Sequence, residues 1–255
     1  MGYTKVLQTC IASRAPILLH DNPRARGRSA GARGLVALAA HRSLDPRAEH
    51  MRRSLAMSAA LPVVYLARHG ETAWTISGQH TGATDLPLTA HGEAEAMQLA
   101  ERLAGLTFAA VFTSPLQRAV RTCNLAGFGS VAEVEPALVE WNYGAYEGRT
   151  SAEIRAERPD WQVFRDGCPG GESPEQVGLR ADRVIHRVRA IGRDVLLFSS
   201  AHFLRVFAAR WLGLEPGAGR YFVLGTASLS ALGYEHDRSE PVIRLWDERS
   251  DAAVS

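Results

Sequence analysis

The sequence predicts an α/β fold, a three-layer sandwich in which a mostly parallel central sheet is flanked by helices. Two short apolar runs, residues 63–67 and 195–198, are bounded by polar or turn-forming residues. Such runs are typical of strands that are buried on both faces, and these strands usually belong to parallel sheets. Segments with helical spacing of apolar residues separate the predicted strands. Strands that alternate with helices pack as layers, which is the basis of the predicted fold class.

The first 56 residues differ in composition from the rest of the 255-residue chain. They hold ten of the 29 Lys and Arg residues but only three of the 27 Asp and Glu residues. We therefore interpret residues 1–56 as a basic N-terminal extension and residues 57–255 as the folded domain. Three origins of the extension stay open: sequence upstream of a true start at Met57, a disordered basic tail, or an Arg-rich targeting segment.

Composition also argues against several classes of partner. The basic excess lies outside the predicted domain and has no interleaved aromatic residues, so we expect no nucleic-acid partner. No apolar run reaches the roughly 18 to 20 residues of a membrane span, so we expect no membrane partner. Cys10, Cys123 and Cys168 show no paired spacing, which favours a reduced, cytoplasmic setting and structural roles for the thiols. No ligand motif indicates a metal or another cofactor.

The other elements follow along the chain. Thr89 is expected to cap a helix that buries one face, consisting of Ala90, Ala94, Met97, Leu103 and Ala104. Further strands are expected at residues 111–113, 227–234 and 242–246, and further helices at residues 116–126 and 203–212. Residues 133–140 are expected to be extended, and residues 151–171 to form a short helix followed by a loop.

A capping box opens one more predicted helix. Ser173 and Gln176 have the spacing of this motif, and Pro174 occupies the first helical position. The core face of the helix is expected to consist of Val177, Ala181, Val184, Val188 and Ile191.

Charged and titratable residues follow the predicted strands. The first buried strand ends in Arg68 and His69, and Gly70 then allows a sharp turn. Ligands of open α/β sheets bind beyond the carboxyl ends of the strands. Arg118 falls in the first turn of a helix that follows another strand, where phosphate groups are attracted. Taken alone, Arg68 and Arg118 could equally be solvated charges, and His69 could be a strand-end residue bonded to a carbonyl.

Longer motifs favour the functional interpretation. They are Arg68-His69-Gly70-Glu71-Thr72-Ala73-Trp74, Gly78 to Thr89, Ser114 to Ala119, Glu140 to Gly148, and Gly167 to Ser173. In this order they resemble the histidine phosphatase superfamily, also called the phosphoglycerate mutase-like family. Within this superfamily, the motifs are most similar to those of the short acid-phosphatase and sedoheptulose-bisphosphatase-like branch.

The resemblance implies a metal-independent phosphatase that acts on a small phosphorylated metabolite and needs no cofactor. It implies that His69 becomes a phosphohistidine, that Glu140 protonates the leaving group, and that Arg68 and Arg118 bind the phosphoryl oxygens. It further implies that the phosphate pocket is lined by Thr75, Thr81 and Gly82. A homodimer is an open alternative to a monomer. His80, His91, His186 and His236 are interpreted as loop or surface residues.

One motif departs from the family. The second buried strand should end in His-Gly, but alignment on Phe203 and Arg205 places Ser200 and Ala201 there, with His202 next. The second catalytic histidine is therefore expected to be missing, and Ser200 can donate only a neutral hydrogen bond. Three outcomes are open: His202 substitutes, the phosphatase is slowed, or the fold binds a phosphorylated ligand without turnover. A cofactor-dependent phosphoglycerate mutase ranks lower, because Thr75 replaces the usual Asn.

Overall fold

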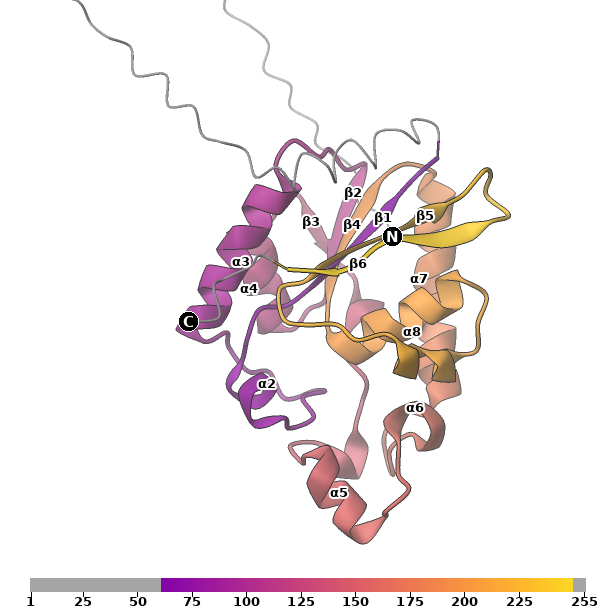
Figure 1. The fold of residues 1–255 in the computed structure, drawn as a ribbon. Coiled ribbons are helices and arrows are strands. Elements are labelled where there is room, and N and C mark those ends of the chain that lie inside the picture. Colours follow the sequence, from indigo (N-terminus) through magenta and orange to yellow (C-terminus); the bar gives the residue numbers. More distant parts are fainter. Residues whose placement is uncertain (1–60, 250–255) are drawn as a thin grey trace, which may run out of the picture. The chain divides into compact units, whose positions relative to one another are not determined.

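The computed structural model describes residues 61–249, so the predicted extension, residues 1–56, lies outside the described residues. Six strands form one sheet in the order β3-β2-β4-β1-β5-β6 (Figure 1). In chain order, the strands are β1 Val64–Arg68, β2 Ala110–Thr113, β3 Ala132–Val134, β4 Val195–Ser199, β5 Leu229–Tyr234 and β6 Pro241–Glu248. The strands β1, β2 and β4 pair in parallel, as does β3 with β2, whereas β5 and β6 are antiparallel. The predicted mostly parallel sheet is confirmed.

Helices cover both faces of the sheet (Figure 1). The longer ones are α3 Ala90–Leu103, α4 Gln117–Leu125, α7 Pro174–Ile191 and α8 Ala201–Trp211. Val64 and Leu66 of β1 belong to a buried cluster with α7 and α8, whereas Tyr65 and Ala67 belong to a cluster with α3 and α4. Since successive side chains of a strand point to opposite faces, this alternation produces the three layers.

The capping box of α7 forms as predicted. The Ser173 hydroxyl accepts a hydrogen bond from the Gln176 amide, and the Gln176 side chain accepts one from the Ser173 amide. The helix ends at Gly192, which has a φ of 66°. Four of the five predicted core residues are fully enclosed, and Ile191 is partly buried.

The buried face of α3 differs from the prediction. Of the five predicted residues only Leu103 is buried, and Ala90, Ala94, Met97 and Ala104 are exposed. The helix instead buries Gly92, Ala96, Leu99 and Arg102 beside Leu103. The reason is a contact between backbones: a Cβ atom on Gly92 would lie 2.2 Å from the Glu71 carbonyl oxygen, and one on Gly70 would lie 2.3 Å from the Gly92 carbonyl oxygen. The turn after β1 therefore packs against the first turn of α3 and determines which side of the helix faces inward.

Shorter elements gather beyond the carboxyl ends of β1 and β4 (Figure 1). They are α2 Ala73–Ser77, α5 Ser151–Glu157 and α6 Val163–Asp166, and of these only α5 was predicted. Residues 133–140 are extended only in part, because a 3-10 turn spans Pro136–Leu138. The helix α8 begins at Ala201 rather than Phe203, so it includes His202 in its first turn. Along residues 61–249, none of the helices has the length and apolar character that crossing a bilayer requires.

We expect Gly92→Ala to lower the free energy of unfolding by about 1–3 kcal/mol, because the new methyl group meets the backbone of Glu71 and has no room to move. The better helix propensity of alanine, worth about 1 kcal/mol, offsets only part of this loss. Urea denaturation measures the effect. Ala94→Ser, on the exposed side of the same helix, is the matched control and should stay within about 0.5 kcal/mol of wild type. Equal stability of the two variants would contradict the proposed contact.

Candidate active site

A cavity of about 270 Å³ lies at the carboxyl ends of β1 and β4. Its lining combines residues from distant parts of the chain: Arg68, His69, Trp74, Thr75, Gly78, Gln79, His80, Thr81, Glu140, Tyr143, Ser151, Ala201 and His202. Six of these were predicted as site residues from the sequence. Parallel strands bring their carboxyl ends to one edge of a sheet, so this is where the topology places ligands.

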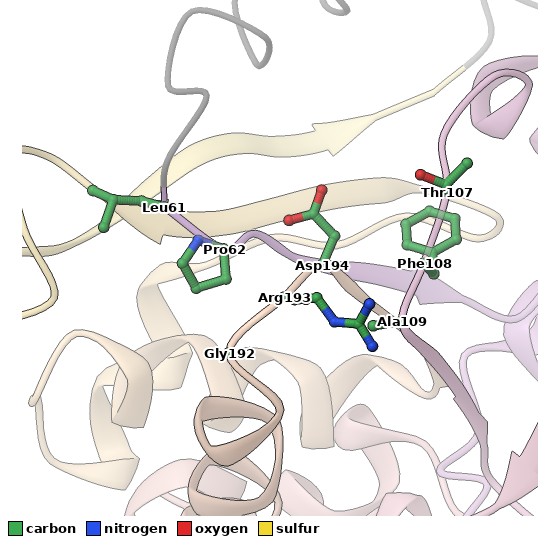
Figure 2. Close-up of a pocket in the computed structure, with 8 residues that line it drawn as sticks. All are labelled: Leu61, Pro62, Thr107, Phe108, Ala109, Gly192, Arg193 and Asp194. Carbon is green, nitrogen blue, oxygen red and sulfur yellow. The ribbon is translucent and has the colours of Figure 1, made fainter.

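A larger cavity, of about 400 Å³, lies at the opposite edge of the sheet. Figure 2 shows its lining residues, which come from the segments that lead into β1, β2 and β4. The Asp194 carboxylate there accepts a hydrogen bond from the Val63 amide at 2.9 Å, so it anchors the start of β1. This cavity contains none of the predicted site residues.

The His69 ring is held in one orientation and one tautomer. The backbone of His69 bonds to Ser199 through its amide and to Ala227 through its carbonyl, with distances of 3.0 Å in both cases. The Nδ1 atom lies 2.8 Å from the Gly70 carbonyl oxygen. Since a carbonyl oxygen only accepts, Nδ1 carries the proton, and Nε2 has a free lone pair. A neutral ring in this tautomer is the form that acts as a nucleophile.

The surroundings of His69 favour its neutral form. Burial is the largest cause, followed by the positive charges of Arg118 and Arg68, and together they hold the pKa of His69 well below its usual value of 6.5. The hydrogen bond to Gly70 acts in the other direction and is the smallest of these effects. Loss of solvation disfavours the charged form of an imidazole, and neighbouring cations disfavour it further.

Arg118 is fully buried and bound to a loop rather than to an acid. Its Nη1 atom donates to the Thr84 carbonyl at 2.9 Å, and Nη2 donates to the carbonyls of Thr81 and Gly82 at 3.0 Å. The Nε atom is buried and has no hydrogen-bond partner. The loop is held in turn by Glu147, whose carboxylate accepts from the amides of Gly82 and Thr84.

Arg68, which is partly buried and lines the cavity, is also held by a backbone carbonyl. Its Nη1 atom donates to the Leu224 carbonyl at 2.5 Å, and its Nε atom is buried without a partner. Within residues 61–249, neither Arg68 nor Arg118 forms an ion pair. Buried charges are normally paired, because desolvation of an unpaired charge costs several kcal/mol. Two unpaired guanidinium groups beside one imidazole therefore form a site that favours an anion with several oxygens.

Glu140 joins this site to the N-terminus of α8. Its Oε1 atom accepts from the amides of Trp141 and Phe203, and Oε2 accepts from the His202 amide at 3.0 Å. Within residues 61–249, Oε2 makes this single hydrogen bond, and Glu140 lines the cavity. Arg180, on α7, supports the segment by donating to the carbonyls of Ala137, Val139 and Glu140. A carboxyl group is thus fixed at the edge of the cavity.

Four predicted residues are placed differently from the others. Arg118 is wholly buried and is not among the residues that line the cavity. The Thr75 hydroxyl lines the cavity but is used in the capping box of α2, with Thr72. Gly82 is not among the lining residues, and its carbonyl accepts a hydrogen bond from Arg118. Ser200 is buried beside Ala201, and its hydroxyl has no hydrogen-bond partner.

The interpretation of His80 as a loop or surface residue is confirmed for the loop and wrong for the surface. His80 does lie in a loop, but it is buried, lines the cavity and packs against Tyr143 with ring centroids 4.6 Å apart. Burial lowers its pKa to about 4. His91, His186 and His236 are exposed, as predicted.

Sequence reasoning also missed Trp74, Gln79, Tyr143, Glu147 and Ser151. All but Ser151 lie inside the motifs that indicated the family, so their position in those motifs was the available signal. Cys123 and Cys168 are buried, and burial raises the pKa of each thiol to about 12, which suits structural roles. From Leu61 to Arg249, His, Cys, Asp and Glu side chains form no group of three that could hold a metal ion.

We expect Glu147→Ala to lower the free energy of unfolding by about 2 kcal/mol, because the amides of Gly82 and Thr84 lose a charged acceptor. Chemical denaturation of the variant measures the loss. Glu157→Ala removes an exposed carboxylate from the nearby helix α5 and should change stability by less than about 0.5 kcal/mol. The role assigned to Glu147 fails if both variants match wild type.

Comparisons with known proteins agree with this geometry. The family description Histidine phosphatase superfamily (branch 1) matches residues 64–248. An acid phosphatase of Mycobacterium tuberculosis is 44% identical over 176 residues, covering 67% of this chain and 86% of that protein. A sedoheptulose 1,7-bisphosphatase of Saccharomyces cerevisiae is 37% identical over 193 residues, covering 62% and 70%. A solved structure from a Mycobacterium tuberculosis open reading frame has a TM-score of 0.70 and 39% identity, covering 74% of this chain and 98% of its own. The chain therefore belongs to the histidine phosphatase superfamily.

Proposed function

We propose that this protein hydrolyses a small phosphorylated metabolite through a phosphohistidine on His69. One observation carries the proposal: the His69 imidazole, with a free Nε2 lone pair, lines a cavity beside Arg68, and the guanidinium groups of Arg68 and Arg118 have no anionic partner within residues 61–249. A phosphate monoester supplies the missing negative charge. Its three non-bridging oxygens match the planar donors of Arg68 and Arg118.

In the first step, Nε2 of His69 attacks phosphorus, and the bond from phosphorus to the alcohol oxygen breaks. The guanidinium groups stabilise the negative charge that is spread over the phosphoryl oxygens in the transition state. Glu140, in its protonated form, transfers a proton from Oε2 to the departing alcohol. The mechanism needs no metal ion, because Arg68 and Arg118 supply the positive charge.

In the second step, water enters the position that the alcohol has left. Glu140, now a carboxylate, accepts a proton from the water as its oxygen attacks phosphorus. The bond between phosphorus and Nε2 breaks, and inorganic phosphate leaves with the neutral His69 restored. One side chain serves as acid and then as base, which requires its carboxyl group to stay in place. The three amides that bind Glu140 fix it there.

We expect His69→Ala to lower the turnover of p-nitrophenyl phosphate by more than about 10³-fold, because the nucleophile is removed. The assay contains EDTA and measures nitrophenolate and phosphate release. His186→Ala, which changes an exposed histidine on α7, is the matched control and should keep wild-type activity.

The alternatives give different results in this assay. A mutase interconverts 2- and 3-phosphoglycerate without phosphate release. A protein that only binds phosphorylated ligands shows no turnover in the wild type and binds phosphate in calorimetry. Turnover that EDTA abolishes would contradict the metal-independent mechanism.

The low pKa of His69 leads to a prediction about pH. As pH falls from 8 to 6, an ordinary histidine becomes protonated, but His69 should stay neutral because burial and two guanidinium groups oppose its charge. Its ring resonances, assigned by comparison with His69→Asn, should therefore move little in this range. The His236 resonances are an internal control, since Glu240 raises the pKa of this exposed ring. A titration of His69 at or above pH 6.5 would exclude the proposed environment.

A further inference from the structure

Ser200 occupies the N-terminal cap of α8 without capping it. A serine in this position normally accepts hydrogen bonds from the second or third amide of the helix. Here the Glu140 carboxylate accepts from those amides, which belong to His202 and Phe203. The Ser200 hydroxyl is left buried with no hydrogen-bond partner among residues 61–249, and Ser200 is not among the residues that line the cavity.

The next polar side chain of the helix does reach the cavity. His202 lines it together with His69 and Arg68. The Nδ1 atom of His202 lies 2.5 Å from the Tyr143 hydroxyl oxygen. Its Nε2 atom makes no hydrogen bond within residues 61–249.

The pairing determines which nitrogen of His202 carries the proton. Burial and the charge of Glu140 hold the pKa of Tyr143 well above 10, so the hydroxyl keeps its proton. The only hydrogen-bond partner with acceptor capacity near this hydroxyl in the described structure is Nδ1 of His202. An unused buried hydroxyl proton costs about 1–3 kcal/mol, so the hydroxyl donates to Nδ1. Burial also keeps His202 neutral, because its pKa is well below 6.5. The ring's single proton is therefore on Nε2.

Neighbouring aromatic rings restrict His202 further. The Phe164 ring meets it edge to face, with centroids 5.1 Å apart, and the His80 ring lies 5.9 Å away. The Arg205 guanidinium lies over the Phe164 ring, 4.4 Å from its centroid. A ring held by packing and by one hydrogen bond presents its donor in a fixed direction, as a preorganised site requires.

We propose that His202, oriented by Tyr143, donates a hydrogen bond from Nε2 to the phosphoryl group and so replaces the histidine that is absent from position 200. Tyr143 is then a positioning residue. The inference rests on the proposed function, because it assigns a donor for the same phosphoryl group. It explains how a site with serine at position 200 keeps a full set of donors.

Two substitutions by amide side chains distinguish the roles of the two ring nitrogens of His202. The amide nitrogen of glutamine reaches the position of Nε2, whereas that of asparagine reaches only the position of Nδ1. With p-nitrophenyl phosphate we expect His202→Asn to lower kcat by about 10²- to 10³-fold, the usual effect of losing one transition-state donor. His202→Gln should lose less than about tenfold. His186→Asn, on the exposed side of α7, is the control for the substitution itself and should match wild type.

Tyr143→Phe tests the positioning role by a measurement other than activity. In wild type, the nitrogen-15 shifts of the His202 ring should show the proton on Nε2. In Tyr143→Phe the two tautomers should mix, and kcat should fall by about three- to tenfold as the fraction of the correct tautomer falls. Unchanged shifts in Tyr143→Phe would overturn the positioning role.

A second background tests the replacement directly. In Ser200→His, the new ring should take over the donor role, so adding His202→Asn should cost less than about fivefold. Equal losses in both backgrounds, or wild-type kcat in His202→Asn, would overturn the inference while the loss in His69→Ala still supports the proposed function. If the wild type has no turnover and Ser200→His creates it, both proposals fail. Thermal melting of each variant identifies any that is unfolded, and the nitrogen-15 shifts of wild type decide the tautomer without a variant.

Discussion

Two positive charges that have no acidic partner among residues 61–249 are the constraint on which the rest of this site depends. Arg68 and Arg118 are held by backbone carbonyls of residues 81–84 and 224, and these dipoles satisfy only part of each guanidinium group. An unpaired charge that is removed from water lowers the free energy of unfolding as long as no anion is bound. It is tolerated because a rigid fold surrounds it: the ends of β1 and β4 on one side, and a loop fixed by Glu147 on the other. The charge that the fold leaves unpaired is what makes the site suited to an anion.

The acidic side chain nearest to this charge is used in a different way. Glu140 does not pair with either arginine but binds the first turn of α8. Its contact with the helix has two consequences. It fixes a carboxyl group at the edge of the cavity, and it removes the capping role from Ser200. The departure from the family motif and the position of the acid are therefore parts of one local arrangement, which the sequence presents as two unrelated motifs.

Much of the framework could be predicted from the sequence, and the reasons for the exceptions are physical. The strands β1 and β4 and the capping box of α7 depend on residues that are close in the chain, so local patterns indicated them. The face of α3 depends on Gly70 and Gly92, whose backbones meet across 22 residues, and an apolar pattern does not contain that contact. The burial of His80 and the pairing of Tyr143 with His202 depend on chain segments that only the folded structure brings together. The residues of the first buried strand could be predicted from the sequence, whereas the contacts of His80 and Tyr143 could not.

The hydrogen bond from His69 to Gly70 joins neighbouring residues, and this locality has a consequence for the protein's tolerance of change. The orientation of the His69 ring is set by one peptide unit at the end of β1, whereas its electrostatic environment also depends on Arg118, which lies in α4 and is held by the loop of residues 81–84. A change in that loop would leave the orientation of the imidazole intact but would disturb the guanidinium group beside it. Sequence changes around the cavity can therefore alter its electrostatic environment without changing how the His69 ring is held.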